Sequence, residues 1–498
     1  MRLLLFTICF FGGYLLAGGQ AFNILDYGAN PDGTTLCTEK IQKAIDEAYA
    51  QGGGRVVFPE GRFLSGSVIL KSNVELHLQK GAVLLGSTDP AHYIKLSRWK
   101  ALIMAEDEAN IAITGEGEID GQGRTLALHI DSLFYAGKID SADYNFVEMR
   151  PKYYLRPQLI EFVRVRNIRV TDVALKNAAC WVATYDQCSD IVIDNVATIS
   201  DAYWNNDGID ISDCRNVRIT NCFVNSADDG ICLKSHAKDF ICDSIYISDC
   251  IVRSSASAIK FGTVSHGGFT NVQIKNIKVY DTFRSAVALE CVDGGLLENV
   301  IIDSVYALNT GNAIFIRLGK RNKVGEVGTL RNVVLKNIYV EVAYERPDYA
   351  YDIRGPELPF FHNVFPSSIT GLPDHPVENV VLENIEIVFP GRGNKGLAYS
   401  PLSRLDDVPE KASAYPEFSM FGELPAWGFY VRHVDGLLMK NVRLSIQSPD
   451  YRPAFVFSDV SGLALQSVSV AGDDKPEQVV LHKSGEVKTD SGLKVLEK

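Results

Sequence analysis

Three aspartates occur in two short strings whose residue types suit acid–base catalysis. Asp207 lies in the string NNDGID (205–210), and Asp228 and Asp229 lie in DDGI (228–231), one repeat later. When the apolar residues of the two strings are aligned, Asp207 falls directly over Asp229. Carboxylates this close raise one another's pKa, so that one stays protonated while its neighbour is ionised. Glycoside hydrolysis needs such a pair, a protonated acid beside an ionised base.

A repeated strand pattern must position the two strings. The order Asn or Asp, apolar, any, apolar, any, Asn or Asp recurs at intervals of 23 to 28 residues. Each copy alternates with period two, which indicates a strand with one apolar face. Repeats of this length predict an all-β fold, a parallel β-helix. The alternative, a β-sandwich, would need hairpin turns between neighbouring strands, and these are missing. The first six copies begin at Asn167, Asp190, Asn216, Ser244, Asn271 and Asn299.

The chain ahead of the repeats predicts a helix over residues 38–50 that ends at the glycines 52–54. Such a helix would cap the first coil and hide its unpaired edge. Three longer interruptions, near 121–156, 344–376 and 390–427, predict ordered loops on the groove side. We therefore expect residues 22–498 to form a single catalytic domain.

The first 21 residues predict a signal peptide. Arg2 precedes an apolar run, 3–16, which small residues follow up to Ala21. The run is too short to favour a membrane anchor. We therefore expect a secreted or periplasmic protein without a membrane segment after cleavage. The net charge of −12 argues against nucleic acid as a partner, and we expect a monomer.

The ten cysteines present two alternatives. Seven lie between Cys180 and Cys250, at matching positions of the repeat. This recurrence favours reduced thiols that pack as small apolar groups inside the coils. A disulfide framework, usual in small exported proteins, is the alternative. The spacings do not suggest a zinc site, and we expect no metal.

In the strands that follow the aspartates, the residues between the apolar positions face outward and stack from coil to coil. These columns are polar and of mixed charge. Solvated charges that pair with one another are the alternative explanation for Lys260, Glu290 and Arg317. This alternative is weaker for the aspartates, because packing does not require a column of carboxylates. The outward columns are Asp207, Asp229, Ser257, Ser285, Asn312; then Asp210, Cys232, Lys260, Ala288, Phe315; then Ser212, Lys234, Gly262, Glu290, Arg317.

On these motifs the chain resembles glycoside hydrolase family 28, the polygalacturonases and rhamnogalacturonan hydrolases. The resemblance includes DYGA (26–29), GGGRVVFP (52–59), IDGQG (119–123), NND (205–207) and DD (228–229). It implies a right-handed parallel β-helix and inverting hydrolysis of a pectic glycan without a metal or other cofactor. It also implies that Asp228 is the general acid and that Asp207 and Asp229 activate the attacking water.

Two departures from the family pattern concern the substrate. Ser257 stands where the family has histidine in Gly-His-Gly, and Ala288-Leu289-Glu290 replaces Arg-Ile-Lys. In polygalacturonases those cations hold a galacturonate beyond the scissile bond, so their loss favours a neutral leaving sugar such as rhamnose. The remaining cations would then serve an acidic sugar on the other side of the cut. The substrate-binding candidates are Asn205, Asp210, Lys234, Ser257, Lys260, Glu290 and Arg317.

The resulting expectation is an exo-acting galacturonidase on rhamnogalacturonan or galacturonan oligosaccharides, with aromatic loops closing one end of the groove. Two alternatives stay open. A polysaccharide lyase on the same scaffold would use Lys260 as the base that removes the α-proton. A glycan-binding β-helix that has lost activity would account for the missing cations, although all three aspartates are retained.

Overall fold

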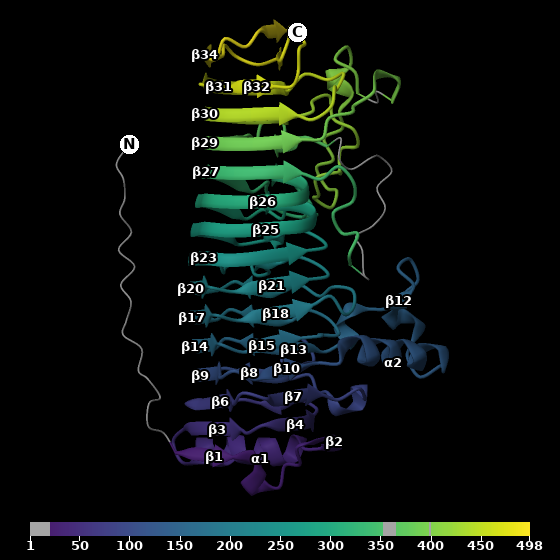
Figure 1. Ribbon diagram of the computed structural model, residues 1–498, viewed down its shortest axis with the longest axis vertical. Helices are drawn as coiled ribbons and strands as arrows, with labels where there is room; N and C mark the ends of the chain where they lie inside the picture. Colours follow the sequence, from purple (N-terminus) through teal and green to yellow (C-terminus); the bar gives the residue numbers. More distant parts are fainter. Residues whose placement is uncertain (1–19, 352–364, 398–399) are drawn as a thin grey trace.

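The computed structural model describes residues 20–351, 365–397 and 400–498, and its strands wind into one long coil (Figure 1). Thirty-three strands of the described chain join into a single sheet, and neighbouring coils pair in parallel. The predicted all-β, right-handed parallel β-helix is confirmed. The predicted signal peptide falls almost wholly in residues 1–19, which lie outside the described residues. The helices of the described chain are all too short or too polar to cross a membrane.

Each coil contains three strand positions. The first carries the Asn-rich repeat, and its inward residues stack in register, as in Ile168, Ile191 and Val217. The corner residues Asn167 and Asn216 have positive φ, which Asn tolerates better than most residues. The shorter strands at this position are β3 (Gly54–Phe58), β6 (Val74–Leu78), β9 (Ala109–Thr114), β14 (Arg166–Thr171), β17 (Ser189–Asp194), β20 (Arg215–Thr220) and β34 (Lys488–Thr489).

The second and third positions complete each coil. The second holds β4 (Gly61–Ser65), β7 (Ala82–Gly86), β10 (Glu118–Asp120), β15 (Ala174–Lys176), β18 (Ala197–Ser200), β21 (Phe223–Ser226) and β32 (Ser469–Ala471). The third holds β5 (Val68–Ile69), β8 (Ala101–Glu106), β13 (Gln158–Val163), β16 (Ala183–Asp186), β19 (Ile209–Ser212), β22 (Ile231–Ser235), β24 (Ile259–Ser265), β28 (Ser367–Thr370), β33 (Val479–His482) and β35 (Val495–Glu497).

Longer strands turn the corners between positions without a break. They are β23 (Cys242–Ser254), β25 (Gly268–Cys291), β26 (Leu296–Leu318), β27 (Thr329–Val342), β29 (Val377–Phe389), β30 (Phe429–Ile446) and β31 (Phe455–Gln466). At the start of the chain, β1 (Ala21–Asn23) pairs with β3 and β2 (Asp32–Leu36) pairs with β4. The third position, including the last parts of β25 and β26, carries the outward columns predicted from the sequence.

Two helices flank the coils (Figure 1). The predicted helix is confirmed as α1 (Thr38–Ala50), which buries Ile41, Ala44, Ile45 and Ala48. The prediction of a loop over 121–156 is wrong in part, because α2 (Gly123–Tyr135) occupies its first half and buries an apolar face that includes Leu126 and Ile130. The predicted loop 344–376 contains strand β28, which pairs with β26 and β30. Residues 352–364 and 398–399 of the predicted loops lie outside the described residues.

The nine cysteines of the described chain are free and buried. Cys214, Cys222 and Cys250 each place the thiol 3.1–3.2 Å from the carbonyl oxygen two residues earlier. The same contact at matching positions explains why cysteine recurs there: a small apolar group that satisfies a corner carbonyl. The described thiols are buried, as predicted, and their reduced state stays a prediction.

Candidate active site

The register of the third position brings two of the aspartates together. Ile209 pairs with Ile231, and the Gly208 N–H donates to the Asp229 carbonyl oxygen at 2.9 Å. Asp207 therefore lies opposite Asp229 on the next coil, as the sequence alignment predicted. A carboxylate oxygen of each, together with the Cys232 sulfur, lies within 4.8 Å of the others. Both side chains are almost buried, at 4% and 6% exposure.

Asp228 lies in the turn between β21 and β22 and is more exposed than its two neighbours. The Ser226 and Ser254 hydroxyls donate to its carbonyl oxygen at 2.9 and 2.5 Å, which fixes the turn. Position 230, two residues after Asp228, must be glycine, because a Cβ there would lie 2.6 Å from the Ala258 carbonyl oxygen. Tight coil stacking thus dictates the DDG string that presents Asp228.

Lys234 is the cation of this cluster. Its Nζ lies 2.6 Å from Asp207 Oδ2 and also contacts the Asp210 carboxylate. Burial alone would lower the pKa of Lys234, but the two carboxylates outweigh it and raise the pKa. For Asp207, burial raises the pKa to about 7, although the charge of Lys234 acts to lower it. The direct contact with the ammonium favours the ionised form of Asp207.

Asp228 has the opposite environment. Burial raises its pKa to about 7, and the charges of Asp207 and Asp229 add to the effect. No cation of the described residues forms an ion pair with it, although the charges of Arg284 and Lys234 act to lower its pKa. The two carboxyls therefore share a raised pKa of about 7 and differ in their partner, since the ammonium of Lys234 touches Asp207. This asymmetry favours Asp207 as the base and Asp228 as the acid.

The loop ahead of Asp207 is fixed by Asn206, which has no exposed surface. Its Oδ1 accepts hydrogen bonds from the Ser200 hydroxyl and from the N–H groups of Ala202 and Tyr203. Its Nδ2 donates to the carbonyl oxygens of residues 178 and 180. These five bonds determine where the loop presents Asp207.

The substrate-binding candidate Asn205 faces the insertion rather than an open groove. Its Oδ1 accepts a hydrogen bond from Arg156 Nη2 at 2.7 Å. Arg156 is buried and also donates to the carbonyl oxygens of Ala179 and Trp204. Arg156, which the sequence analysis missed, thus fastens the insertion 121–156 to the loop that carries Asp207.

Three candidates lie on the C-terminal side of the aspartates. The Ser257 N–H donates to Asp229 Oδ1 at 3.1 Å, so this position orients Asp229 through its backbone. Lys260 Nζ lies 3.0 Å from Glu290 and 3.9 Å from Asp229. Burial raises the pKa of Glu290 to about 7, against the lowering effect of Lys260. Lys260 and Glu290 therefore largely neutralise each other.

The structure does not bring Arg317 to the aspartates. Its guanidinium donates to the carbonyl oxygens of Gly371 (3.0 Å) and Glu410 (2.7 Å) and lies over the Phe421 ring. With a 1% exposed surface, it joins β26 to the two C-terminal loops. Burial lowers the pKa of Arg317 to about 10. The contacts indicate a structural role in place of the predicted contact with substrate.

Sequence reasoning missed two further residues beside the cluster. Arg284 lies one residue before Ser285 of the outward column, and its Nε is 3.5 Å from Glu417. The Tyr415 ring lies 5.6 Å from both Lys260 Nζ and the Arg284 guanidinium. Arg284 was detectable from its place in the register. Tyr415 belongs to a loop without repeats, so the sequence carried no signal for its position.

One group among the described residues has the geometry for a metal ion: Asp207, Asp229 and Cys232. The donor set does not fit a cation. Lys234 already occupies a carboxylate oxygen of Asp207. Burial raises the pKa of Cys232 well above its ordinary value, and its thiol lies 3.2 Å from the Gly262 carbonyl oxygen. A protonated thiol beside an ammonium is a poor ligand site.

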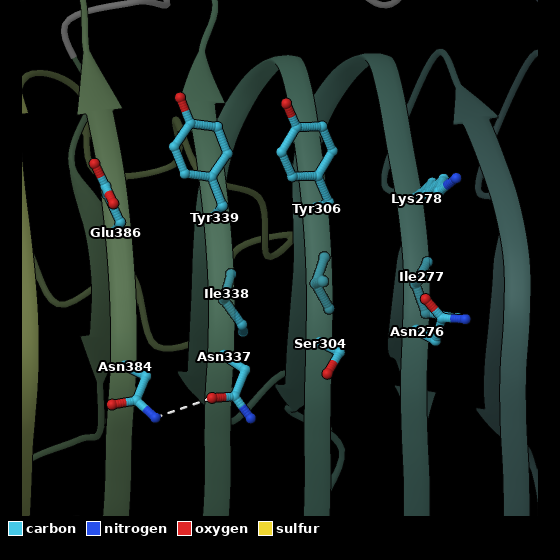
Figure 2. Close-up of a pocket in the computed structure, with 11 residues that line it drawn as sticks. Asn276, Ile277, Lys278, Ser304, Tyr306, Asn337, Ile338, Tyr339, Asn384 and Glu386 are labelled. Atoms are coloured by element: carbon cyan, nitrogen blue, oxygen red, sulfur yellow. Dashed lines mark hydrogen bonds between the residues drawn. The ribbon is translucent and has the colours of Figure 1, made fainter.

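A hollow lies on strands β25, β26, β27 and β29, away from the aspartates (Figure 2). It has a volume of about 370 Å³. Tyr306 and Tyr339 stack there with ring centroids 5.2 Å apart. Glu386 is its one lining carboxylate, so it lacks the acid–base pair and is not the catalytic candidate.

The chain is similar to known glycoside hydrolases. The family model described as "Glycosyl hydrolases family 28" matches residues 53–342. A relative from Vitis vinifera, named "Probable polygalacturonase", is 23% identical over 78% of this chain and 82% of its own length. The "Exo-poly-alpha-D-galacturonosidase" of Dickeya chrysanthemi is 24% identical over 74% of this chain and 71% of its own length.

Solved structures show the same fold. A family 28 exopolygalacturonase of Yersinia enterocolitica superposes with a TM-score of 0.57 at 20% identity, covering 96% of this chain and 79% of that one. A polygalacturonase of Erwinia carotovora gives a TM-score of 0.54 at 17% identity, covering 74% and 93%.

Proposed function

Because the chain belongs to glycosyl hydrolases family 28, and is therefore a glycoside hydrolase, we propose that it is an exported, inverting enzyme that acts on the ends of pectic oligosaccharides. Polygalacturonase-type activity follows from the family and from relatives that include exo-acting enzymes. Export rests on the sequence of the first 21 residues alone, and the monomeric state stays a prediction.

The proposed mechanism assigns one step to each side of the glycosidic bond. Asp228 donates its proton to the glycosidic oxygen as the bond to the anomeric carbon breaks. Asp207 and Asp229 hold a water between their oxygens and take its proton as it attacks the opposite face of that carbon. The product anomer is therefore inverted. The observation that carries this assignment is the contact of Lys234 with Asp207, whereas no cation of the described residues makes such an ion pair with Asp228.

Side chains and loops at both ends of the cluster support action on chain ends. Ahead of the aspartates, the Trp99 N–H donates to Glu161 of β13 at 2.7 Å, and Arg98 pairs with Asp186 of β16 at 3.1 Å. Behind them, the Tyr415 ring covers Lys260 of β24. Only three strand spacings, roughly 14 Å, separate β16 from β24. Such a short interval suits a few sugar units and disfavours a long chain.

The proposed substrate is a rhamnogalacturonan or galacturonan oligosaccharide from which a terminal galacturonate is released. The relatives' names support galacturonate as the released sugar. The mutual neutralisation of Lys260 and Glu290 supports a neutral leaving sugar, because the ammonium at this position already has Glu290 as its partner and is not free to bind a sugar carboxylate. Arg284 is a second cation near this position, and Glu417 already pairs with it.

Product analysis tests the proposal. The protein is incubated with homogalacturonan oligosaccharides and with rhamnogalacturonan oligosaccharides that carry galacturonate at the non-reducing end. We expect free galacturonate from the second set, with the inverted anomer appearing first in proton NMR spectra. Asp228→Asn should lower kcat by about 10²–10⁴-fold, whereas the exposed control Asp239→Asn should not. Unchanged activity of Asp228→Asn, or retention of the anomer, would refute the mechanism.

The structure gives the lyase alternative little support. A lyase would need an uncharged base near the sugar's α-proton. Burial opposes the charge of Lys260, but Asp229 and Glu290 outweigh it and raise its pKa, so the ammonium persists. Products without an unsaturated, ultraviolet-absorbing sugar would exclude a lyase directly. Hydrolysis of either oligosaccharide set would exclude a purely binding role.

A further inference from the structure

We propose that the hollow on strands β25, β26, β27 and β29 is a non-catalytic binding site for an extended, uncharged polysaccharide chain. The site would hold the protein on a neutral glycan while the aspartates act on another face of the coil. The inference goes beyond the proposed function, because it concerns a surface and a class of glycan that the catalytic assignment does not use. Binding there requires neither the aspartates nor the hydrolysis of a pectic substrate.

The hollow lies at the bend between the first and second strand positions, whereas the aspartates belong to the third. Along one edge runs a corner column with one residue per coil: Asn276, Ser304, Asn337 and Asn384. All four have positive φ, which turns the chain at this point. The strands of the hollow face the viewer in Figure 1, and the described loops gather to one side of the coil. Every lining residue belongs to the four strands, so no described loop closes the hollow.

Two tyrosines lie along the other edge (Figure 2). Tyr306 of β26 and Tyr339 of β27 pair in register, and their rings stack with centroids 5.2 Å apart and an interplanar angle of 13°. Tyr306 is nevertheless 49% exposed. The Tyr339 hydroxyl donates to Glu341 Oε1 at 2.6 Å, which fixes its ring. Fixed, exposed tyrosine rings offer a flat apolar surface at low entropic cost, and the C–H face of a pyranose packs on such a surface.

The corner column supplies hydrogen-bonding groups next to the rings. Asn384 Nδ2 donates to Asn337 Oδ1 at 2.9 Å (Figure 2), and Asn337 Nδ2 donates to Asp303 Oδ1 at 2.7 Å. Each amide nitrogen carries two hydrogens, so one remains for a ligand on these exposed side chains. Neighbouring coils repeat at about 4.8 Å. An extended glycan chain advances by a similar length per pyranose, so successive sugar units meet successive coils.

The charges around the hollow favour an uncharged chain. Lys278 and Glu386 flank the two rings in the same row, one of each sign (Figure 2). Beside the corner column, Lys336 already pairs with Asp303 at 3.2 Å. A polyuronate carries a negative charge on every unit, so Glu386 and Asp303 would repel it and Lys278 alone would not compensate. A neutral chain meets no such opposition.

The size of the hollow also fits a ligand. Its volume of about 370 Å³ lies within the range of roughly 300–1,000 Å³ that is usual for ligand sites. A cross-strand aromatic pair also stabilises a sheet by itself, however. Binding and stability must therefore be measured together to distinguish a glycan site from a purely structural stack.

Calorimetric titration of the whole chain tests the site. The neutral probes are cellohexaose and xylohexaose, and hexagalacturonate, titrated in the Asp228→Asn background to prevent hydrolysis, is the charged comparison. We expect at least one neutral probe to bind, and Tyr306→Ala to weaken this binding by about tenfold or more. Tyr306→Phe, which keeps the ring, should stay within about threefold of the parent. Tyr49→Ala on α1 removes a tyrosine of equal exposure (50%) outside the hollow and should change nothing.

The outcomes separate this inference from the proposed function. Failure of both neutral probes to bind the parent protein would overturn the site, even with hydrolysis intact. Hexagalacturonate binding that Tyr306→Ala abolishes would overturn the uncharged class. A lower melting temperature for Tyr306→Ala with unchanged binding would reduce the stack to a structural role and overturn the site. If no pectic oligosaccharide is hydrolysed, the proposed function fails, and the neutral titrations still decide on the hollow.

Discussion

At the scale of single residues, contact with one lysine distinguishes Asp207 from Asp228. Asp207 and Asp228 both lie in surroundings that raise their pKa, and both are surrounded by other carboxylates. Of the two, only Asp207 touches Lys234, so the ammonium stabilises the ionised form more strongly there than on Asp228. The two carboxyls therefore differ by their partner rather than by their depth. Lys234 is accordingly a positioning residue that sets the charge of Asp207.

The pH dependence of kcat/KM should report this division. A raised carboxyl pKa keeps Asp228 protonated in mildly acidic solution, and the proton is lost as the pH passes about 7. We therefore expect kcat/KM to fall tenfold per pH unit above that point, because kcat/KM follows the acid of the free enzyme. Initial rates between pH 4 and 9 provide the measurement.

Lys234→Met gives the matching control. Removal of the ammonium should raise the pKa of Asp207 further, since burial then acts unopposed, and move the acidic limb of the profile to higher pH. A profile that stays flat to pH 9 in the parent protein, or an acidic limb that does not move in the variant, would contradict the assignment.

At the scale of elements, the strands set which residues lie opposite each other, and the segments just before the strands carry the catalytic side chains. β19 and β22 fix which residues lie opposite each other, whereas Asp207 and Asp228 stand in the connections just ahead of these strands. Asn206 holds the first connection through five hydrogen bonds, and Gly230 allows the second to pass close to its neighbour. The catalytic geometry thus depends on buried polar residues that never touch the substrate.

Asn206→Ala should therefore weaken both the fold and the reaction. The substitution leaves buried N–H, hydroxyl and carbonyl groups without partners, at a cost of about 3 kcal/mol in the free energy of unfolding. We expect a lower melting temperature and a kcat reduced at least tenfold. Asn225→Ala, which loses one long hydrogen bond to Arg253, should cost less than about 1 kcal/mol. Equal melting temperatures for the two variants would contradict the role of Asn206.

At the scale of the whole molecule, thirty-three strands of the described chain form one coiled sheet, and nine thiols are buried. The coils need no covalent link because each stacks on the next through backbone hydrogen bonds and inward apolar side chains. Burial raises the pKa of several of these thiols, for example that of Cys180 to about 11 and that of Cys291 to about 12, whereas the contact with Cys222 lowers the pKa of Cys250. Protonated, covered thiols resist oxidation even in an oxidising compartment.

A thiol titration checks this prediction. The folded protein should react slowly with a thiol reagent. In guanidinium chloride, all nine described cysteines should react with it. Reductant should leave the melting temperature unchanged. A count of seven or fewer in denaturant, or a melting temperature that falls on reduction, would show a disulfide.

The sequence predicted what repeats and missed what does not. The alternating strands predicted the coil and its register, and the register alone brought Asp207 over Asp229. The same register contained Arg284, one residue before Ser285, but the columns were not extended to it. Helix α2 had an apolar face that a loop assignment ignored. The contact of Tyr415 with Lys260 joins residues far apart in a segment without periodicity, so only the folded chain reveals it.

The covering of Lys260 by Tyr415 has a consequence for the order in which the protein is made. Synthesis and export proceed from the N-terminus, so the coils that carry the aspartates emerge long before the segment that covers their C-terminal side. During that interval the acidic cluster is open at one end. The enclosure proposed to restrict action to chain ends is thus the last property that the growing chain acquires, and loss of the late segment would broaden the choice of substrate before it abolished the chemistry.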